Sequence, residues 1–367
     1  MKTAIISDGL AGFMLAHVLT KMGHSVTLID TNQNPQSESR FCDFGIHFLP
    51  NTPLVRHGLT LLENCFETSF DIQAIPAAPF TVEDNKLKNF IGFGEGRSKA
   101  VEALSFFNAP SRLAINVRES DLVQLALQTG EFKILPFSEL SALKFESLAQ
   151  NSRIENVTLN GQTDLAADQF IYLNAPQDLL ALIPQELLGV RTRSRISKVT
   201  SWARVSLKLT QVSPLPEFSG QVLDELIFLM PNQPDHQPCV GQFAPLGTLQ
   251  SCWQTYILAE LAEDTVYVSN SIKEIRKLVR KAFSVPDTTT KESVIVDLLA
   301  TSDLAWIFDN KEVMNLAENF VFAPRLASQS HGLAQSVECL SRAFDALFAS
   351  SVHAEVDNTS PRLLQHP

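Results

Sequence analysis

The first thirty residues carry the pattern that most restricts how this chain can fold. The apolar run Lys2–Ser7 has the length of a buried strand, and Gly9–Met22 places its apolar residues at helical spacing. Gly23 ends that helix, and the second apolar run Ser25–Ile29 leads to Asp30. Because strand–helix–strand units cross over right-handedly, we expect the two strands to be parallel neighbours in one sheet. The pattern predicts an α/β fold.

The turn between the first strand and the helix has two of the three glycines of a dinucleotide-binding turn. Such a turn needs glycine at three positions: at the bend itself, at the point where the backbone approaches a pyrophosphate, and at the point where the helix packs on the strand. Gly9 and Gly12 meet the last two needs, whereas Ser7 replaces the first glycine and Asp8 adds a carboxylate. Asp30 lies where an acid binds ribose hydroxyls. Dinucleotide binding is predicted, with a Rossmann-like unit that holds no nucleotide as the alternative.

Later segments extend this sheet and add a second one. Further strands are expected over Phe132–Leu135, Leu140–Leu148, Arg153–Leu159, Asp168–Asn174 and Asn319–Phe322, and further helices over Asp121–Thr129, from Pro176 to Leu182, over Ser271–Phe283 and over Gly332–Phe348. Ser120 is expected to cap the first of these helices. A turn at Asn160 and Gly161 indicates a β-meander, and Val199–Val268 is strand-rich.

These segments predict two domains, which a chain of 367 residues can accommodate. The first, discontinuous domain comprises residues 1–75, 115–190 and 315–350, with a parallel sheet plus a β-meander. The second comprises residues 76–114 and 191–314 and is expected to be α+β with a mostly antiparallel sheet. Residues 351–367, which follow Ser350, are expected to form a loose tail.

The charge pattern excludes some partners. The net charge is −11 and the acidic residues are dispersed, so neither nucleic acid nor an anionic membrane surface is an expected partner. The local exception is a basic segment made of Arg191, Arg193, Arg195 and Lys198. It is expected to be a solvated edge beside a strand, with contact to an anion as the alternative.

The cysteine pattern and the hydropathy indicate the expected cellular compartment and whether membrane insertion is expected. The five cysteines never occur as CxxC, which indicates neither a disulfide framework nor a metal site and favours a reducing cytoplasm. No segment approaches the roughly twenty apolar residues that span a bilayer, so no stable membrane insertion is expected. The oligomeric state stays open.

Three later blocks, together with the first unit, carry a family resemblance. They are Asp43–Phe48, Leu165–Ile171 with Asn174–Pro176, and Asn319–Pro324 with His331–Ala334. In these blocks the chain resembles two-domain FAD-dependent oxidoreductases such as flavin amine oxidases, protoporphyrinogen oxidases and carotenoid desaturases, and more distantly aromatic hydroxylases. The resemblance implies that the first domain is a Rossmann-like FAD-binding domain and the second a substrate domain. The chain departs from the family at Ala323–Pro324, where relatives have Gly-Asp, and lacks a double glycine before Arg40.

The resemblance also implies the residues that would hold FAD non-covalently. They are Ser7, Gly9, Leu10, Ala11, Gly12, Asp30, Arg40, Leu140, Ala323, Gly332 and Leu333. Leu140 matches the position whose backbone meets the adenine. Gly332 opens a helix whose N-terminus, in relatives, points its amides at the flavin and the pyrophosphate.

Three residues are catalytic candidates. His47 and His331 are the histidines nearest the expected flavin face and would donate a proton or orient substrate; the alternative is a hydrogen-bonded loop histidine. Arg204 falls near a lysine position of amine oxidases, but because arginine stays protonated, an electrostatic or anion-binding role is expected. Its alternative is a solvent-facing strand residue. Aromatic residues that suit either an apolar substrate pocket or plain core are Phe44, Phe48, Trp202 and Trp253.

The resemblance implies an FAD-dependent oxidoreductase that oxidises an amine or an aromatic or unsaturated substrate by hydride transfer to flavin. Val117–Leu122 is similar to a segment of flavin hydroxylases, so a monooxygenase acting on an aromatic group of a small molecule or a protein side chain stays open. A third reading is a degenerate binding or maturation partner that has lost FAD. Ser7, Asp8 and Ala323–Pro324 favour it.

Overall fold

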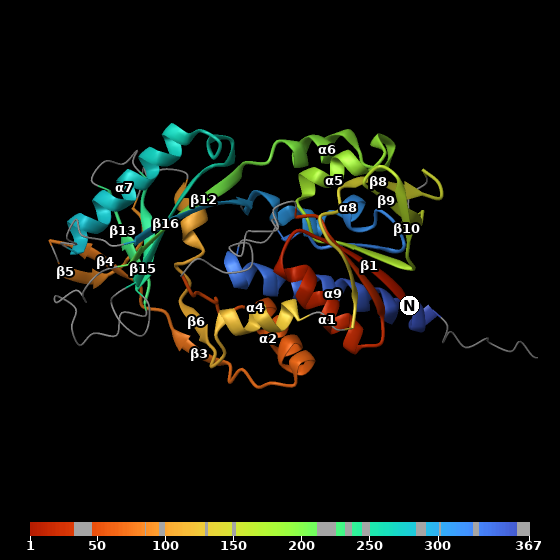
Figure 1. The fold of residues 1–367 in the computed structure, drawn as a ribbon, viewed down its shortest axis with the longest axis horizontal. Helices are drawn as coiled ribbons and strands as arrows, with labels where there is room; N and C mark the ends of the chain where they lie inside the picture. Colours follow the sequence, from red (N-terminus) through yellow and green to blue (C-terminus); the bar gives the residue numbers. More distant parts are fainter. Residues whose placement is uncertain are drawn as a thin grey trace, which may run out of the picture.

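The computed structural model describes residues 1–32, 46–84, 86–94, 100–128, 131–148, 152–210, 225–231, 237–243, 250–283, 291–300, 302–325 and 330–357. These residues form two parts, each organised around a sheet, that lie side by side along the long axis of the molecule (Figure 1). Within them, no helix is long and apolar enough to cross a membrane.

A five-stranded parallel sheet is the centre of the first part. Its order is β17 (Phe320–Phe322), β11 (Gln169–Tyr172), β1 (Lys2–Ser7), β2 (Ser25–Asp30) and β7 (Lys133–Leu135). Ser7 lies opposite Asp30 at the carboxyl ends of β1 and β2, so the predicted parallel pairing is confirmed. All of β1 after Lys2 is buried, as expected for a parallel strand covered on both faces.

Helices cover one face of this sheet and a meander covers the other. The helical layer consists of α1 (Leu10–Lys21), α2 (Pro53–Phe66), α4 (Glu119–Leu127) and α9 (Gly332–Asp357). The opposite layer consists of the antiparallel strands β8 (Leu140–Phe145), β9 (Ile154–Leu159) and β10 (Thr163–Ala166), with α5 (Pro176–Leu182), η2 (Gln185–Leu187), α6 (Val190–Ser197) and α8 (Lys311–Met314). The predicted β-meander is therefore present. This layering of helices, parallel sheet and meander brings strand ends and helix starts to one edge.

A seven-stranded, mostly antiparallel sheet organises the second part. Its order is β16 (Lys291–Ala300), β12 (Ser201–Thr210), β15 (Gln250–Leu258), β14 (Cys239–Phe243), β13 (Ile227–Leu229), β4 (Phe80–Glu83) and β5 (Lys86–Asn89), and only the pair β13–β4 is parallel. Smaller elements are the paired strands β3 (Gln73–Pro76) and β6 (Ser111–Ala114), α3 (Ala100–Ser105), η4 (Ala259–Leu261) and η5 (Ser302–Asp309). The sheet membership accords with the expected fold class, while the domain boundaries stay a prediction.

The two faces of the larger sheet have different coverings. Helix α7 (Thr265–Phe283) packs on one face, where Trp253 is fully buried beside Phe243 and Phe283. The other face contributes to an aromatic cluster, by which we mean Phe48, Phe90, Phe107, Trp202, Phe228 and Tyr256 with the partly buried Phe93 and Phe106. Trp253 is thus a core residue, whereas Trp202 and Phe48 belong to the aromatic cluster.

Several expected element boundaries were wrong. Helix α4 begins at Glu119, because the amides of Asp121 and Leu122 already bond to the carbonyl of Arg118, so Ser120 is not its cap. Helix α7 begins at Thr265, because the Asp264 carboxylate accepts the amides of Val266 and Tyr267.

Two further corrections concern helices. Helix α9 continues to Asp357, beyond the expected end at Phe348, and no glycine or proline interrupts it after Gly332. The segment expected to be loose is therefore helical up to Asp357. The basic segment expected beside a strand lies on helix α6 and its C-terminal end.

Candidate active site

The turn after β1 is closed by the Ser7 side chain, at the position where the dinucleotide-binding fingerprint has its first glycine. The Gly9 amide donates to Ser7 Oγ at 3.3 Å, and the Ser7 hydroxyl donates to the Gly9 carbonyl at 3.2 Å. A Cβ atom at Gly12 would lie 2.4 Å from Ser7 Cβ and 2.6 Å from Ser7 Oγ. Gly12 therefore has the helix-packing role expected for it, and Ser7 depends on that glycine for its own space.

The N-terminus of α1 is open toward the edge of the sheet. Gly9 is its N-cap in an extended conformation, and no side chain caps the first turn. The amides of Leu10 and Ala11 thus belong to the unsatisfied donors that make a helix N-terminus an anion site, while their side chains are buried in the core. A Cβ at Gly9 would meet nothing closer than Arg325 Nε at 3.7 Å, so the space in front of this turn is bounded by an arginine.

That arginine compensates the acidic residue of the turn. Arg325 Nη2 lies 3.2 Å from Asp8 Oδ2, and Arg325 Nη1 donates to Gln335 Oε1 at 2.8 Å. Asp8 Oδ1 and Arg325 Nε are buried and have no hydrogen-bond partner among the described residues. The pair leaves one acceptor and one donor unused beside the helix N-terminus. Sequence reasoning missed Arg325, although it directly follows the recognised block that ends at Pro324.

A cavity of about 540 Å³ opens at the carboxyl ends of β1, β2 and β11. Its lining residues are Asp8, Thr31, Asn32, Ser138, Glu139, Leu140, Tyr172, Asn174, Asp178, Ala181 and Leu182. Ligands of α/β sheets bind in such crevices outside the carboxyl ends of the strands, and the volume is that of a small-molecule pocket. Leu140, expected near an adenine, is one of these lining residues.

Polar groups at the end of β2 are arranged around this cavity. Asp30 is buried, and its Oδ1 accepts the Asn32 amide at 3.2 Å. Asn174 Nδ2 donates to Thr31 Oγ1 at 2.8 Å, whereas the buried Asn174 Oδ1 has no partner among the described residues. This unused acceptor suits a hydroxyl or amino donor on a ligand.

The cavity is acidic. Asp8, Glu139 and Asp178 line it, and the pKa of the Asp178 carboxyl is raised by burial and by the nearby Asp8. Burial also raises the pKa of the Tyr172 phenol well above its usual value. Such a lining disfavours a phosphate inside the cavity and favours a neutral group rich in donors, such as a nucleoside. A phosphate would be placed better toward α1 and Arg325.

His331 lies at the start of α9 inside the aromatic cluster. It is 4% exposed, and its Nε2 donates to the Ala103 carbonyl at 2.8 Å. Tyr256 stacks on the ring and Phe106 meets it edge-on, with centroid distances of 5.3 and 4.6 Å. Burial lowers the pKa of His331 to about 3, despite the hydrogen bond to Ala103. The imidazole is therefore neutral near pH 7 and can orient a group but has no extra proton to donate.

The other catalytic candidates lie on the same side of the second sheet. Arg204 on β12 is 7% exposed and is paired in register with Tyr256, so the solvent-facing alternative was wrong. The His47 side chain is exposed, and its amide donates to Gln242 Oε1 at 2.8 Å. His47 adjoins Phe48 of the aromatic cluster.

The remaining predicted site residues lie at the end of β17, at the start of α9 or outside the described residues. Ala323 is buried at the end of β17, where its amide donates to the Tyr172 carbonyl. Gly332, with a left-handed φ of 57°, and the buried Leu333 open α9 next to His331. Arg40 and Phe44 lie outside the described residues. The structure thus brings the turn, Asp30 and Leu140 to one edge of the parallel sheet, and Arg204 and His331 to the aromatic cluster. The side chain of His47 is exposed instead.

Comparison with known proteins establishes the fold. No protein-family model and no curated protein matches the sequence. Among solved structures, an oxidoreductase from Methanosarcina mazei has a TM-score of 0.58 at 14% identity, over 93% of this chain and 99% of that one. A candidate FAD-containing monooxygenase from Photorhabdus luminescens subsp. laumondii has a TM-score of 0.52 at 11% identity, over 99% and 91%. A triple mutant of the flavin-dependent brominase Bmp2 has a TM-score of 0.50 at 12% identity, over 99% and 82%. The chain has the two-domain, FAD-binding-like fold of these proteins.

Proposed function

We propose that this protein is an FAD-dependent oxidoreductase. The cavity at the carboxyl edge of the parallel sheet carries the proposal, because it adjoins the open N-terminus of α1 and is lined by Leu140 and Asn174. The size of the cavity and the hydrogen-bond acceptors that line it fit an adenosine group. A bound dinucleotide would satisfy the unused Arg325 Nε through its diphosphate and the unused Asn174 Oδ1 through a hydroxyl or amino group.

Three groups of residues would bind different parts of the cofactor. Leu140, Asn32 and Asn174 would hold the adenosine, with Asp30 fixing the end of β2 through Asn32. The first-turn amides of α1 would hold the diphosphate, with Arg325 supplying positive charge beside them. Gly332, at the start of α9, would direct the flavin end toward the aromatic cluster.

Bound FAD supplies a hydride acceptor, and the protein supplies orientation and a dry surface. The aromatic cluster excludes water from the start of α9, and the neutral His331 holds its ring fixed between Ala103 and Tyr256. Arg204 contributes a positive charge that lowers the pKa of His331 further. The aromatic surroundings favour an aromatic or unsaturated substrate over an aliphatic amine.

A second candidate function is flavin-dependent monooxygenation of an aromatic group. The likeness to the candidate FAD-containing monooxygenase over 99% of this chain favours it. A third candidate is a non-redox binding partner, which the engagement of the Gly9 amide by Ser7 favours, because that amide is then less available to a phosphate.

Cofactor loading tests the proposal. Purified protein is titrated with FAD, and the absorbance near 450 nm and the quenching of flavin fluorescence are followed. We expect saturable binding to a single site, and an aromatic or unsaturated substrate should bleach the bound flavin without oxygen. Bleaching only by a reduced nicotinamide would favour the monooxygenase. If the protein does not bind FAD, the remaining candidate function is that of a non-redox binding partner.

A further inference from the structure

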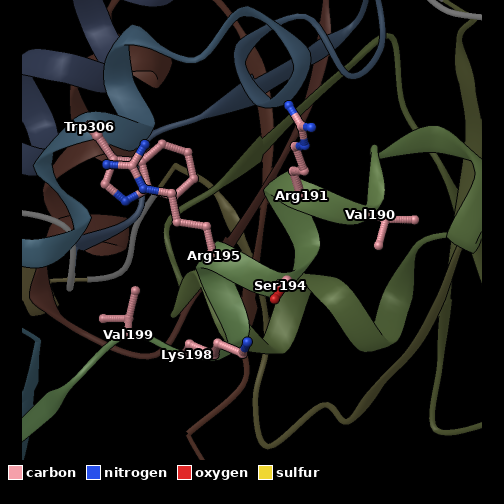
Figure 2. A pocket seen from close by; sticks show the side chains of 7 residues that line it. All are labelled: Val190, Arg191, Ser194, Arg195, Lys198, Val199 and Trp306. Atoms are coloured by element: carbon pink, nitrogen blue, oxygen red, sulfur yellow. The ribbon is translucent and has the colours of Figure 1, made fainter.

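A second groove lies away from the cavity, between α6 and η5. It has a volume of about 630 Å³ and is lined by Arg191, Ser194, Arg195, Lys198 and Trp306 with two valines (Figure 2). Three cationic side chains and no acidic one line it, in a chain whose net charge is −11.

Helix α6 separates an inward face from this cationic face. On the inward face, Thr192 donates to Glu312 Oε2 at 2.6 Å, and Arg193 donates to the carbonyls of Leu180 and Pro184. Arg191, Arg195 and Lys198 follow at positions i, i+4 and i+7, which is one side of a helix. Among the described residues, no carboxylate pairs with these three side chains. The face therefore carries three cations that no carboxylate of the described residues neutralises, one of which, Arg195, contacts Trp306.

Trp306 gives the groove a planar wall. The Arg195 guanidinium lies 4.0 Å from the centroid of the indole ring, and Figure 2 shows it reaching from α6 to that ring. The indole Nε1 is buried and has no hydrogen-bond partner among the described residues. A guanidinium held on an aromatic ring is preorganised for a planar anionic ligand, because its outer face can stack and its edge can donate to phosphate.

The groove also lies at a structural junction. Helix α6 directly precedes β12 and η5 directly follows β16, and β12 pairs with β16 from Ser201–Ala300 onward. Both walls are therefore connections between the two sheets. A ligand that contacted both walls would join the segment before β12 to the segment after β16.

We propose that this groove binds a free nucleotide, with the base against Arg195 and Trp306 and the phosphates reaching the cations on either side of Arg195, namely Arg191 and Lys198. Its volume is in the range of small-molecule sites, and apolar side chains beside cations match a ligand that carries both a base and a phosphate. The groove is distinct from the cavity proposed to hold FAD, since the two share no lining residue.

Calorimetric titration with ADP tests the site. FAD is added first at saturation, and its uptake is recorded separately, so that failure of cofactor binding and failure of this groove are told apart. We expect ADP to bind one site in the parent protein and at least tenfold more weakly in Arg191→Gln/Lys198→Gln. The control Lys133→Gln/Lys273→Gln removes the same charge from exposed lysines elsewhere and should change affinity less than twofold.

Further probes establish which part of the ligand is recognised. Inorganic phosphate should bind more weakly than ADP, and Trp306→Leu should remove most of that difference. NADP⁺ binding more tightly than ADP would identify the nucleotide as a nicotinamide dinucleotide and support the site. Equal ADP affinity in the parent and the groove variant, equal affinity for phosphate and ADP, or binding of only an acidic peptide would each overturn the proposal.

Discussion

Asp8 and Arg325 determine the charge in front of the glycine turn. Each uses only part of its hydrogen-bonding capacity on the other, and their side chains are 33% and 22% exposed. In a turn that would receive a diphosphate, the carboxylate opposes the ligand and the guanidinium attracts it. The pair therefore sets affinity through a balance that single substitutions can shift in opposite directions.

Substitutions of Asp8 and of Arg325 should change the affinity for FAD in opposite directions. Asp8→Asn removes the repelling charge and releases Arg325, so FAD should bind about tenfold more tightly, or ~1.4 kcal/mol. Arg325→Gln leaves Asp8 uncompensated and should weaken binding by a similar factor. Flavin fluorescence quenching gives both dissociation constants. Equal affinities in both variants and the parent would show that the diphosphate does not bind at this turn.

His331 should make stability depend on pH in the acid range. Its pKa of about 3 in the folded protein lies below the ordinary 6.5, so the unfolded chain binds the proton more readily between these values. The stabilisation is present above pH 6.5 and is lost as the pH falls toward 3, by about 1.5 kcal/mol between pH 6.5 and 5.

Urea unfolding of the parent and of His331→Gln at pH 7, 6 and 5 measures this contribution. The variant should be less stable at pH 7, because it loses the buried contacts with Ala103 and Tyr256, and its free energy of unfolding should fall less on acidification. Parallel pH curves would show that His331 is not the titrating group.

At the scale of elements, Gly12 lets α1 lie close to the end of β1. We expect Gly12→Ala to destabilise the protein by about 1–3 kcal/mol, because its Cβ would overlap Ser7. Adding Ser7→Gly should restore most of this loss by removing the other side chain. Gly9→Ala is the matched control, since its nearest neighbour is 3.7 Å away, and it should leave stability nearly unchanged. Thermal unfolding of the parent and of these three variants tests this; a double variant as unstable as Gly12→Ala would mean that Ser7 is not what the new methyl group meets.

The elements that sequence predicted best are those defined by local pattern. The unit from Lys2 to Asp30 and the meander follow from apolar periodicity and turn residues over short spans. Helix ends were missed where tertiary contacts or a side-chain cap decide them, as at Asp264. Arg325 was missed because its partner Asp8 is 317 positions away. Likewise, the aromatic cluster draws Phe48 and Tyr256 from segments that no local pattern connects.

At the scale of the whole molecule, an ion pair links smaller elements to the second sheet. Arg112 on β6 lies 3.0 Å from Glu225, which precedes β13, and the two side chains are 13% and 17% exposed. Glu225 also accepts the Ala78 amide at 3.4 Å. Because β6 pairs with β3 and its Arg112 forms a bridge with Pro50, the contact joins the segment before α2 to the seven-stranded sheet.

Breaking this pair should weaken the junction between the two parts. We expect Arg112→Gln and Glu225→Gln each to lower the free energy of unfolding by about 1–3 kcal/mol, because each removes one charge of a largely buried ion pair. The double variant should lose less than the sum of the two, since neither charge then remains uncompensated. Urea unfolding in a Trp306→Phe background, where tryptophan fluorescence reports on Trp202 and Trp253 in the second sheet, gives the coupling for that part. Bound-flavin fluorescence would report on the first part. Strictly additive losses would mean that the two side chains act separately and that the ion pair does not couple β6 to the segment before β13.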